Sequence, residues 1–294
     1  MSQPSQYAVW GNPIAQSKSP RIHQLFGEQT AKNISYIAKL GDEQQFEQQL
    51  QQFFAEGSKG ANITAPFKER AFALADIHSE GCLLAEACNT LKRLDDGRLY
   101  ADNTDGFGLK SDLERLGWLI PNQRILILGA GGATKGVLYP LLQAEQQITL
   151  YNRTHQKAVE LAEKFTHYVR SSSRWQSQRS NASVCAKFGN IQTACLEEVA
   201  QQSFDLIINA TSLGLQGKYV ELPKSTFNQA KVYDMQYAKE QQTPFLNYAR
   251  SQGVTECQDG LGMLVGQAAH AFNLWENVMP DMEKVLKVLK NEMK

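Results

Sequence analysis

A glycine-rich turn has the composition of a phosphate-binding site. The turn and the residue after it are Gly129, Ala130, Gly131, Gly132 and Ala133. An apolar run at 124–128 precedes the turn and a helical pattern follows it. A strand, a glycine turn and a helix in this order are typical of dinucleotide sites, because small residues let a pyrophosphate approach the backbone N–H groups. Thr134 replaces the usual third glycine, which we interpret as a variant; an ordinary tight turn is the alternative.

The residues after the next expected strand indicate which dinucleotide is bound. The run 147–151 ends in Asn152-Arg153-Thr154, and Lys157 follows one helical turn later. An NAD-specific site usually has a carboxylate here, which holds the ribose 2′-hydroxyl. Two cations and no acid instead suit the negative charge of a 2′-phosphate. We therefore predict NADP(H), since cations at a helix start are otherwise unfavourable.

Lys68 and Asp105 have the residue types of an acid–base pair. An expected strand at 60–64 ends in Thr64, and Lys68 begins the following helix. Open α/β sheets bind ligands at this end of their strands. A lysine in a first helical turn opposes the helix dipole, which favours a chemical role, although most single lysines are solvated. Asp105 opens a later helix, and its alternative role is a helix cap.

Ser17 and Ser19 lie at the expected start of another helix. Ser19 precedes Pro20, so we expect Ser19 at the N-cap and Pro20 at the first helical position. Two hydroxyls beside free backbone N–H groups form a plausible seat for a carboxylate. The simpler alternative is a capped helix without a ligand.

The composition is typical of a globular protein that binds neither nucleic acid nor membranes. The chain has 294 residues, 42% of them hydrophobic, which suggests two domains with sizeable cores. Lysine and arginine balance aspartate and glutamate at 30 each, so neither nucleic acid nor membrane is expected as a partner. No signal peptide or membrane span is recognisable. The five cysteines form no CxxC pair, so we expect reduced thiols in a cytoplasmic protein and no metal site.

Hydrophobic periodicity predicts two α/β halves that position these residues. The expected strands lie at 7–10, 36–40, 60–64, 89–94, 98–101, 124–128, 147–151, 204–208, 231–234 and 254–257. The expected helices lie at 19–31, 45–54, 68–75, 80–86, 106–116, 133–142, 154–165, 194–201, 243–252, 263–275 and 281–291. A basic, serine-rich tract within 167–190 is expected to be an inserted surface loop.

Several stretches together resemble the shikimate dehydrogenase family over nearly the whole chain. The matching stretches are residues 11–20, 61–69, 87–90, 102–106, 129–133, 152–154, 209–212, 233–235 with Tyr237, and 259–267. Their order and spacing match jointly, which is more specific than any one of them. The insertion at 167–190 departs from the family pattern, as does Gln16, where many members have histidine.

The resemblance implies a reversible, NADPH-dependent reduction of 3-dehydroshikimate to shikimate, a step of aromatic amino-acid biosynthesis. It implies that Lys68 and Asp105 are the catalytic pair. The implied substrate contacts are Ser17, Ser19, Thr64, Asn89, Asp105, Tyr237 and Gln267. The implied cofactor contacts are Gly129, Ala130, Gly131, Gly132, Ala133, Asn152, Arg153, Thr154, Lys157, Thr211, Met235 and Gly260. On residue type alone, Gln267 could equally be an exposed helix position.

The implied fold is an N-terminal α/β substrate domain and a doubly wound, Rossmann-type NADP domain, with C-terminal helices that return to the first domain. We expect residues 1–104 and 260–294 in the substrate domain and 105–259 in the NADP domain. The substrate is expected between the domains, with a hinge near 103–106. The expected partner is the small-molecule substrate, and the sequence leaves room for a homodimer.

Two alternatives stay open. One is a sister enzyme of the same fold that also oxidises quinate or uses NAD, against which the missing acid at position 152 argues. The other is a non-catalytic, NADP(H)-binding regulator. The presence of both Lys68 and Asp105 argues against a regulator, because a regulator needs neither.

Overall fold

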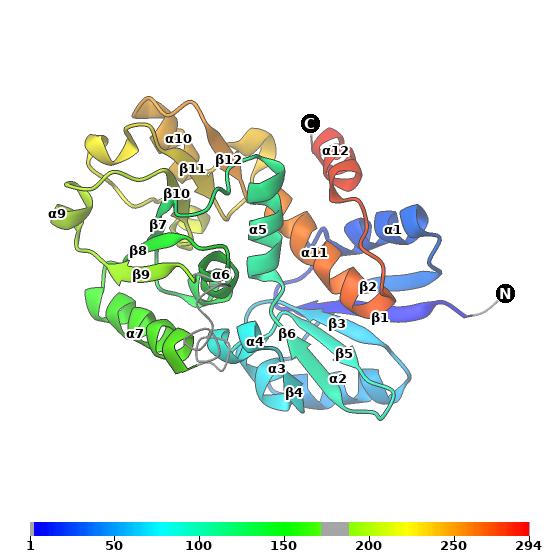
Figure 1. Ribbon diagram of the computed structural model, residues 1–294. Coiled ribbons are helices and arrows are strands. Elements are labelled where there is room, and N and C mark those ends of the chain that lie inside the picture. The colour runs from blue at the N-terminus through cyan, green and yellow to red at the C-terminus, as the bar shows by residue number, and fades with distance from the viewer. Residues whose placement is uncertain (1–2, 172–187, 294) are drawn as a thin grey trace, which may run out of the picture. The chain divides into compact units, whose positions relative to one another are not determined.

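The chain divides into two compact units, each built around its own sheet (Figure 1). The computed structural model describes residues 3–171 and 188–293. The first unit comprises residues 1–108 and 264–292, and the second comprises 109–263 and 293–294. Most of the tract expected to be a surface insertion lies outside the described residues.

The first unit holds a mixed six-stranded sheet in the order β2-β1-β3-β5-β6-β4. Its strands are β1 (Ser5–Gly11), β2 (Ile34–Leu40), β3 (Gly60–Ile63), β4 (Ile77–His78), β5 (Thr90–Arg93) and β6 (Leu99–Asp102). β1 pairs in parallel with β2 and β3, whereas β5 and β6 form the predicted antiparallel hairpin. The parallel strands therefore end together at one edge of the sheet, where the turns after β1 and β3 begin.

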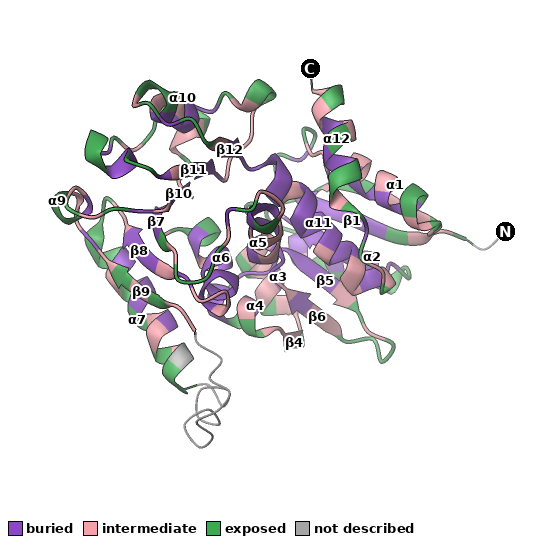
Figure 2. Ribbon diagram, turned by 45° about the horizontal axis from the view of Figure 1, so that its top comes forward, coloured by how far each residue is buried: buried purple, intermediate pink, exposed green. Residues whose placement is uncertain are grey.

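Helices cover the apolar side chains of this sheet. They are α1 (Ser19–Thr30), α2 (Phe46–Ala55), α3 (Lys68–Leu74), α4 (Glu80–Ala85), α12 (Met282–Glu292), and parts of α5 (Asp105–Arg115) and α11 (Leu261–Glu276). The predicted apolar face of α2 is buried, because Phe46, Leu50 and Phe53 pack with Trp10 of β1 and Phe67. In Figure 2, α11 is buried along most of its length, whereas α1 exposes its outer face.

The second unit is a parallel six-stranded sheet in the order β12-β11-β10-β7-β8-β9. Its strands are β7 (Arg124–Leu128), β8 (Gln147–Tyr151), β9 (Asn190–Thr193), β10 (Leu206–Asn209), β11 (Lys231–Asp234) and β12 (Cys257–Asp259). Its helices are α6 (Gly132–Gln143), α7 (His155–Ser171), α9 (Leu196–Val199) and α10 (Pro244–Ser251), with three 3₁₀ turns at Leu213–Gln216, Lys224–Phe227 and Lys239–Gln241. After β7, the chain first adds β8 and β9 on one side of it and then β10, β11 and β12 on the other. The prediction of an α/β protein with a doubly wound sheet is therefore confirmed.

Several predicted boundaries are wrong, and one strand was not predicted. β12 occupies Cys257–Asp259 rather than 254–257, because Val254 is a buried loop residue and pairing with β11 begins only at Cys257. α7 continues to Ser171 rather than ending near Phe165. β9 was not predicted, since Asn190–Thr193 is a short, half-exposed edge strand. α1 begins at Ser19, so Lys18 rather than Ser19 is its N-cap.

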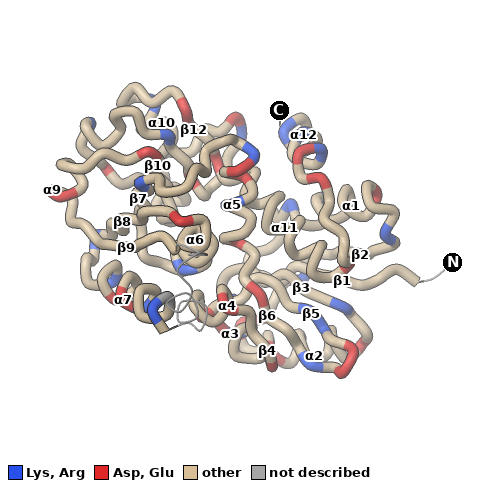
Figure 3. The backbone as a smooth tube through the Cα atoms, viewed as in Figure 1, with Lys and Arg blue, Asp and Glu red and all other residues tan. Residues whose placement is uncertain are grey.

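Charged residues of both signs are distributed over the two units, and the described helices are short or polar. Figure 3 shows cationic and anionic residues interspersed along both units. Within residues 3–171 and 188–293, no helix has the length and apolar character needed to cross a membrane.

Candidate functional site

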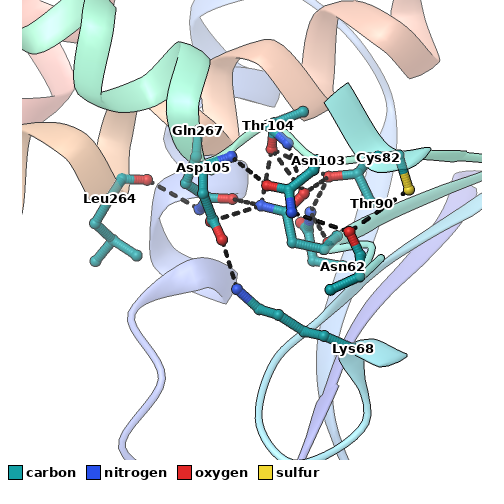
Figure 4. A network of polar contacts seen from close by, with 11 residues as sticks. Asn62, Lys68, Cys82, Thr90, Asn103, Thr104, Asp105, Leu264 and Gln267 are labelled. Atoms are coloured by element: carbon teal, nitrogen blue, oxygen red, sulfur yellow. Dashed lines mark hydrogen bonds and ion pairs between the residues drawn. The ribbon is translucent and has the colours of Figure 1, made fainter. Parts of the chain in front are cut away.

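Lys68 and Asp105 form an ion pair in the first unit (Figure 4). Lys68 is the first residue of α3, and Asp105 is the first residue of α5. The Lys68 Nζ lies 2.5 Å from Oδ2 of Asp105. The side chains are 32% and 17% exposed, respectively, so the pair is accessible to a small molecule. The carbonyl of Lys68 accepts a hydrogen bond from the N–H of Cys88, which fixes the start of α3 against the segment before Asn89.

One amide side chain contacts the other oxygen of Asp105, and a second amide contacts the first. Asn89 donates from Nδ2 to Oδ1 of Asp105 over 2.8 Å. The same nitrogen lies 3.3 Å from Oε1 of Gln267, whose own nitrogen donates to the carbonyl of Leu264. Gln267 is only 8% exposed, so its interpretation as an exposed helix position is wrong. The first unit therefore gathers Lys68, Asp105, Asn89 and Gln267 into one polar cluster.

The predicted carboxylate seat lies at the start of α1. Ser17 Oγ accepts a hydrogen bond of 3.3 Å from the N–H of Ser19, so Ser17 satisfies a backbone donor that the helix leaves free. Burial raises the pKa of Tyr36 well above its usual value, and a hydrogen bond with the Ser19 side chain opposes that rise. The phenol of Tyr36 donates to Asn62 Oδ1 over 2.7 Å. Thr64 follows the end of β3, two residues after Asn62.

Three other predicted residues lie at the carboxyl ends of β11 and β12 in the second unit. Gly260 packs directly against the backbone of Met235, because a Cβ at Gly260 would lie 2.2 Å from the carbonyl oxygen of Met235. Burial raises the pKa of the Tyr237 phenol, and Asp259 adds to that rise. Tyr237 is therefore neutral at physiological pH and can donate a hydrogen bond.

A pocket of about 660 Å³ lies along the glycine-rich turn of the second unit. Its lining is Gly129, Ala130, Gly131, Gly132, Ala133, Tyr151, Asn152, Arg153, Ala210, Thr211, Ser212, Leu213, Lys218, Tyr219, Val220 and Glu221. Gly129 has a φ of +107°, which favours glycine. α6 starts at Gly132 without a side-chain cap, and no atom lies within 4 Å of the Cβ position of Gly131. These features leave room and backbone donors for a phosphate group.

The end of β8 forms one wall of this pocket. Asn152 accepts a hydrogen bond from the N–H of Ala130 over 3.2 Å and donates to the carbonyl of Thr154 over 2.8 Å. Arg153 is exposed and lines the pocket. Thr154, Lys157, Met235 and Gly260 lie outside the lining. The absence of an acid at the end of β8, together with Arg153, fits a ligand that carries an additional phosphate.

Comparison with known families assigns both units. The family model described as the shikimate dehydrogenase substrate binding domain matches residues 9–91, and that of shikimate/quinate 5-dehydrogenase matches residues 114–213. A shikimate 5′-dehydrogenase C-terminal domain matches residues 260–290. A curated protein from Glaesserella parasuis named shikimate dehydrogenase (NADP(+)) is 73% identical and aligns over 98% of this chain and 99% of its own length. The chain belongs to the shikimate dehydrogenase family.

A further curated relative and two solved structures are also similar to this chain. A Pasteurella multocida protein named shikimate dehydrogenase (NADP(+)) is 61% identical over 95% of this chain and 97% of its own length. The crystal structure of the Thermus thermophilus shikimate 5-dehydrogenase in complex with NADP(H) and shikimate has a TM-score of 0.80 at 29% identity, with 99% and 100% of the two chains covered. An Ael1 enzyme from Pseudomonas putida has a TM-score of 0.85 at 41% identity, with 97% and 98% covered.

Sequence reasoning missed two parts of the site in this shikimate dehydrogenase family member. One is the pocket wall at 218–221, where Tyr219 stacks on Tyr248 with 4.5 Å between ring centroids. The other is the set of buried polar neighbours of Asn89, which are Asn62, Thr90 and Thr104. The loop has no periodic pattern that predicts its path, whereas polar residues in short, otherwise apolar strands were a usable signal.

Proposed function

We propose that this chain catalyses the reversible, NADP-dependent interconversion of shikimate and 3-dehydroshikimate. The relatives named shikimate dehydrogenase (NADP(+)) support this activity, because they match the chain over nearly its whole length. The observation that carries the proposal is the partly exposed Lys68–Asp105 pair, with the amides of Asn89 and Gln267 gathered beside it.

Lys68 serves as the acid and base of the proposed reaction. When bound, NADPH supplies a hydride to a ketone carbon. The Lys68 ammonium stabilises the negative charge that grows on the ketone oxygen and gives that oxygen a proton, which yields the alcohol. In the reverse direction the neutral amine takes the hydroxyl proton. Asp105 orients the amine through their 2.5 Å contact, and Asn89 holds Asp105 in turn.

The remaining polar side chains recognise the substrate. We assign the carboxylate to the hydroxyls of Ser17 and Ser19, which lie at the positive end of α1. We assign the ring hydroxyls and further carboxylate contacts to Thr64, Asn89, Asp105, Tyr237 and Gln267. These polar side chains favour a small polyhydroxy acid over an apolar ketone. An apolar ketone would leave the buried polar groups of the site without hydrogen-bond partners.

The pocket of the second unit binds the cofactor in the proposed reaction. The residues at the glycine turn, 129–133, hold the pyrophosphate through backbone N–H groups. Asn152, Arg153, Thr154 and Lys157 lie near the 2′-phosphate. The further cofactor contacts that we propose are Thr211, Met235 and Gly260.

A panel of two substrates and two cofactors tests the proposed function. The appearance of reduced nicotinamide is followed by its absorbance with shikimate or quinate, each with NADP⁺ or NAD⁺. We expect the highest kcat/KM with shikimate and NADP⁺. Faster turnover of quinate or with NAD⁺ would replace this proposal by the dual-specificity enzyme, and no turnover in any combination would favour a non-catalytic NADP(H)-binding protein.

We also infer a cytoplasmic location and a small-molecule partner. The cysteines at 82, 88, 195 and 257 are free thiols, which supports a reducing compartment. A homodimer is the assembly to examine first. Light scattering of the purified chain at several concentrations measures its mass, and a constant monomer mass would exclude the dimer.

A further inference from the structure

Thr90 is a buried residue next to the proposed active site. It begins β5, directly after Asn89, and its side chain is fully buried. Its hydroxyl lies 2.9 Å from Asn89 Oδ1, 3.0 Å from Asn62 Nδ2 and 3.2 Å from Thr104 Oγ1. Thr90 therefore contacts three polar side chains, but it touches neither Lys68 nor Asp105 among the hydrogen bonds of the described residues.

The chemistry of Asn62 determines how the Thr90 hydroxyl is used. Asn62 accepts the Tyr36 phenol proton at Oδ1, which identifies its other terminus as the nitrogen. This Nδ2 donates to the carbonyl of Asn89 over 3.1 Å and to the Thr90 hydroxyl over 3.0 Å. Because an amide nitrogen only donates, the Thr90 oxygen accepts here, and its single proton is available for Asn89 Oδ1.

That proton fixes which way the Asn89 amide faces. Asn89 Oδ1 also accepts from the backbone N–H of Thr104 over 2.8 Å. These two donors, together with the Thr104 hydroxyl at 3.1 Å, hold the oxygen on that side, so Nδ2 faces Asp105 Oδ1. A reversed amide would place its NH₂ against the N–H of Thr104 and its oxygen against the Asp105 carboxylate, and both contacts are repulsive.

The amide in turn determines which oxygen Asp105 offers to Lys68. Asn89 occupies Oδ1, so Oδ2 is left for the ammonium of Lys68 (Figure 4). We propose that Thr90 is a positioning residue, whose hydroxyl, held by Asn62, locks the Asn89 amide and thereby the Lys68–Asp105 pair. This proposal rests on the proposed function, since it assigns Thr90 a role in that reaction.

Removal of the hydroxyl at constant shape tests this role. Thr90→Val deletes the donor to Asn89, whereas Thr90→Ser keeps it. We expect kcat for shikimate oxidation to fall about 10- to 100-fold in Thr90→Val, because small errors in the placement of reacting groups slow catalysis strongly. Thr90→Ser should recover kcat to within about threefold of the wild type, and KM for NADP⁺ should stay within about twofold in both variants.

A matched control separates positioning from a general effect of valine in a buried site. Thr226 is fully buried in the second unit, and its hydroxyl has no hydrogen-bond partner in the described structure. Thr226→Val should therefore keep the wild-type kcat. A Thr90→Val protein with wild-type kcat, or a Thr90→Ser protein as slow as Thr90→Val, would overturn the proposal. A wild-type protein that is inactive on shikimate would instead overturn the proposed function.

A second variant covers the case in which Thr90→Val does not fold. Tyr36→Phe keeps the ring that stacks on His23, with 4.1 Å between centroids, and removes the donor to Asn62 together with the hydrogen bond to the Ser19 side chain. Because Asn62 then loses the contact that orients it toward Thr90, we expect kcat to fall about 3- to 10-fold with KM for NADP⁺ unchanged. Wild-type kcat in a folded Tyr36→Phe protein would contradict the proposed network.

Discussion

We propose that Arg153 selects NADP(H) as the cofactor. Arg153 lines the pocket at the end of β8, where an NAD-specific protein usually has an acid. We expect Arg153→Ala to raise KM for NADP⁺ about 10- to 100-fold, which corresponds to the loss of a charge-assisted contact. The activity with NAD⁺ should change little, because NAD⁺ lacks the 2′-phosphate. Steady-state kinetics with both cofactors measures the difference.

An exposed cation away from the pocket serves as the control for Arg153. Arg98 pairs with Asp96 on the surface of the first unit and is more than half exposed. Arg98→Ala should leave both cofactor constants unchanged. If Arg153→Ala raised KM for NADP⁺ and NAD⁺ equally, Arg153 would not be the reader of the 2′-phosphate.

His23 is expected to make folding sensitive to acid. Its ring is fully buried and stacks on Tyr36, and a hydrogen bond with the Asn62 side chain opposes the effect of burial on its pKa. Burial lowers the pKa of His23 to about 3, from a usual value of 6.5. The unfolded chain therefore binds the proton first. The stability that His23 contributes is complete above pH 6.5 and is lost as the pH falls toward 3, by about 2 kcal/mol between pH 7 and pH 5.

The pH dependence of unfolding measures this contribution. The free energy of unfolding of the wild type and of His23→Phe is obtained from urea titrations at pH 7 and pH 5. The variant should lose about 2 kcal/mol less than the wild type over this interval. Raised pKa values at the partly buried carboxyl of Asp102 and the buried carboxyl of Asp234 act in the opposite direction, but both proteins share them. Equal losses in the two proteins would show that His23 titrates normally.

The residue types of the site were easier to predict than their connections. Lys68 was recognisable because it opposes the dipole of its own helix, and Asp105 because it opens a helix. Thr90 and Asn62 were not recognised. Their role depends on which strands are neighbours in the sheet. β3 and β5 are adjacent, which brings Asn62 to Asn89 although 26 residues lie between them in the sequence. Hydrophobic periodicity does not reveal such a pairing.

At the scale of elements, long periodic segments were predictable and short edge segments were not. The apolar face of α2 and the buried strand β7 follow directly from their patterns. The apolar residue Val254 indicated a strand, yet it packs as a loop residue before β12. β9 alternates exposed and half-buried residues, so its sequence resembles that of a loop. Tertiary pairing rather than local propensity decides these elements.

A buried hydrogen bond joins three elements of the second unit. The phenol of Tyr233 in β11 donates to Asp112 of α5 over 2.7 Å and accepts from the N–H of Met263 in α11 over 3.3 Å. Burial, with Asp112 nearby, raises the pKa of Tyr233 well above its usual value, so the phenol stays protonated. We expect Tyr233→Phe to destabilise the fold by about 1–3 kcal/mol, because a buried carboxylate loses a donor. Thermal unfolding of both proteins, followed by circular dichroism, measures the effect.

Tyr219 offers the matched control in the same unit. It is 38% exposed and stacks on Tyr248, so Tyr219→Phe keeps the ring contact. We expect its melting temperature to equal that of the wild type. A Tyr233→Phe protein that melts at the same temperature as Tyr219→Phe would mean that the Asp112 contact does not stabilise the fold.

For the whole molecule, the proposed function assigns the chemistry to one unit and cofactor binding to the other. The amine and carboxylate of the proposed reaction belong to the first unit, whereas the glycine turn and Arg153 belong to the second. The fold class followed from the sequence because the second half is a succession of apolar strands and helices. The lining of the cofactor pocket was only partly predictable, because residues 218–221 reach the pocket through an irregular loop.

The most direct test of this division of roles is a comparison of turnover and cofactor affinity in Lys68→Met. We predict that kcat for shikimate oxidation falls by at least about 1,000-fold, because the only general acid and base assigned to the reaction is lost. The Kd for NADPH, from fluorescence titration, should stay within about twofold of the wild type. Lys59→Met, which alters an exposed lysine of the same unit, should leave both quantities unchanged. A Lys68→Met protein with near-normal kcat would contradict the assignment of Lys68 as the proton donor and acceptor.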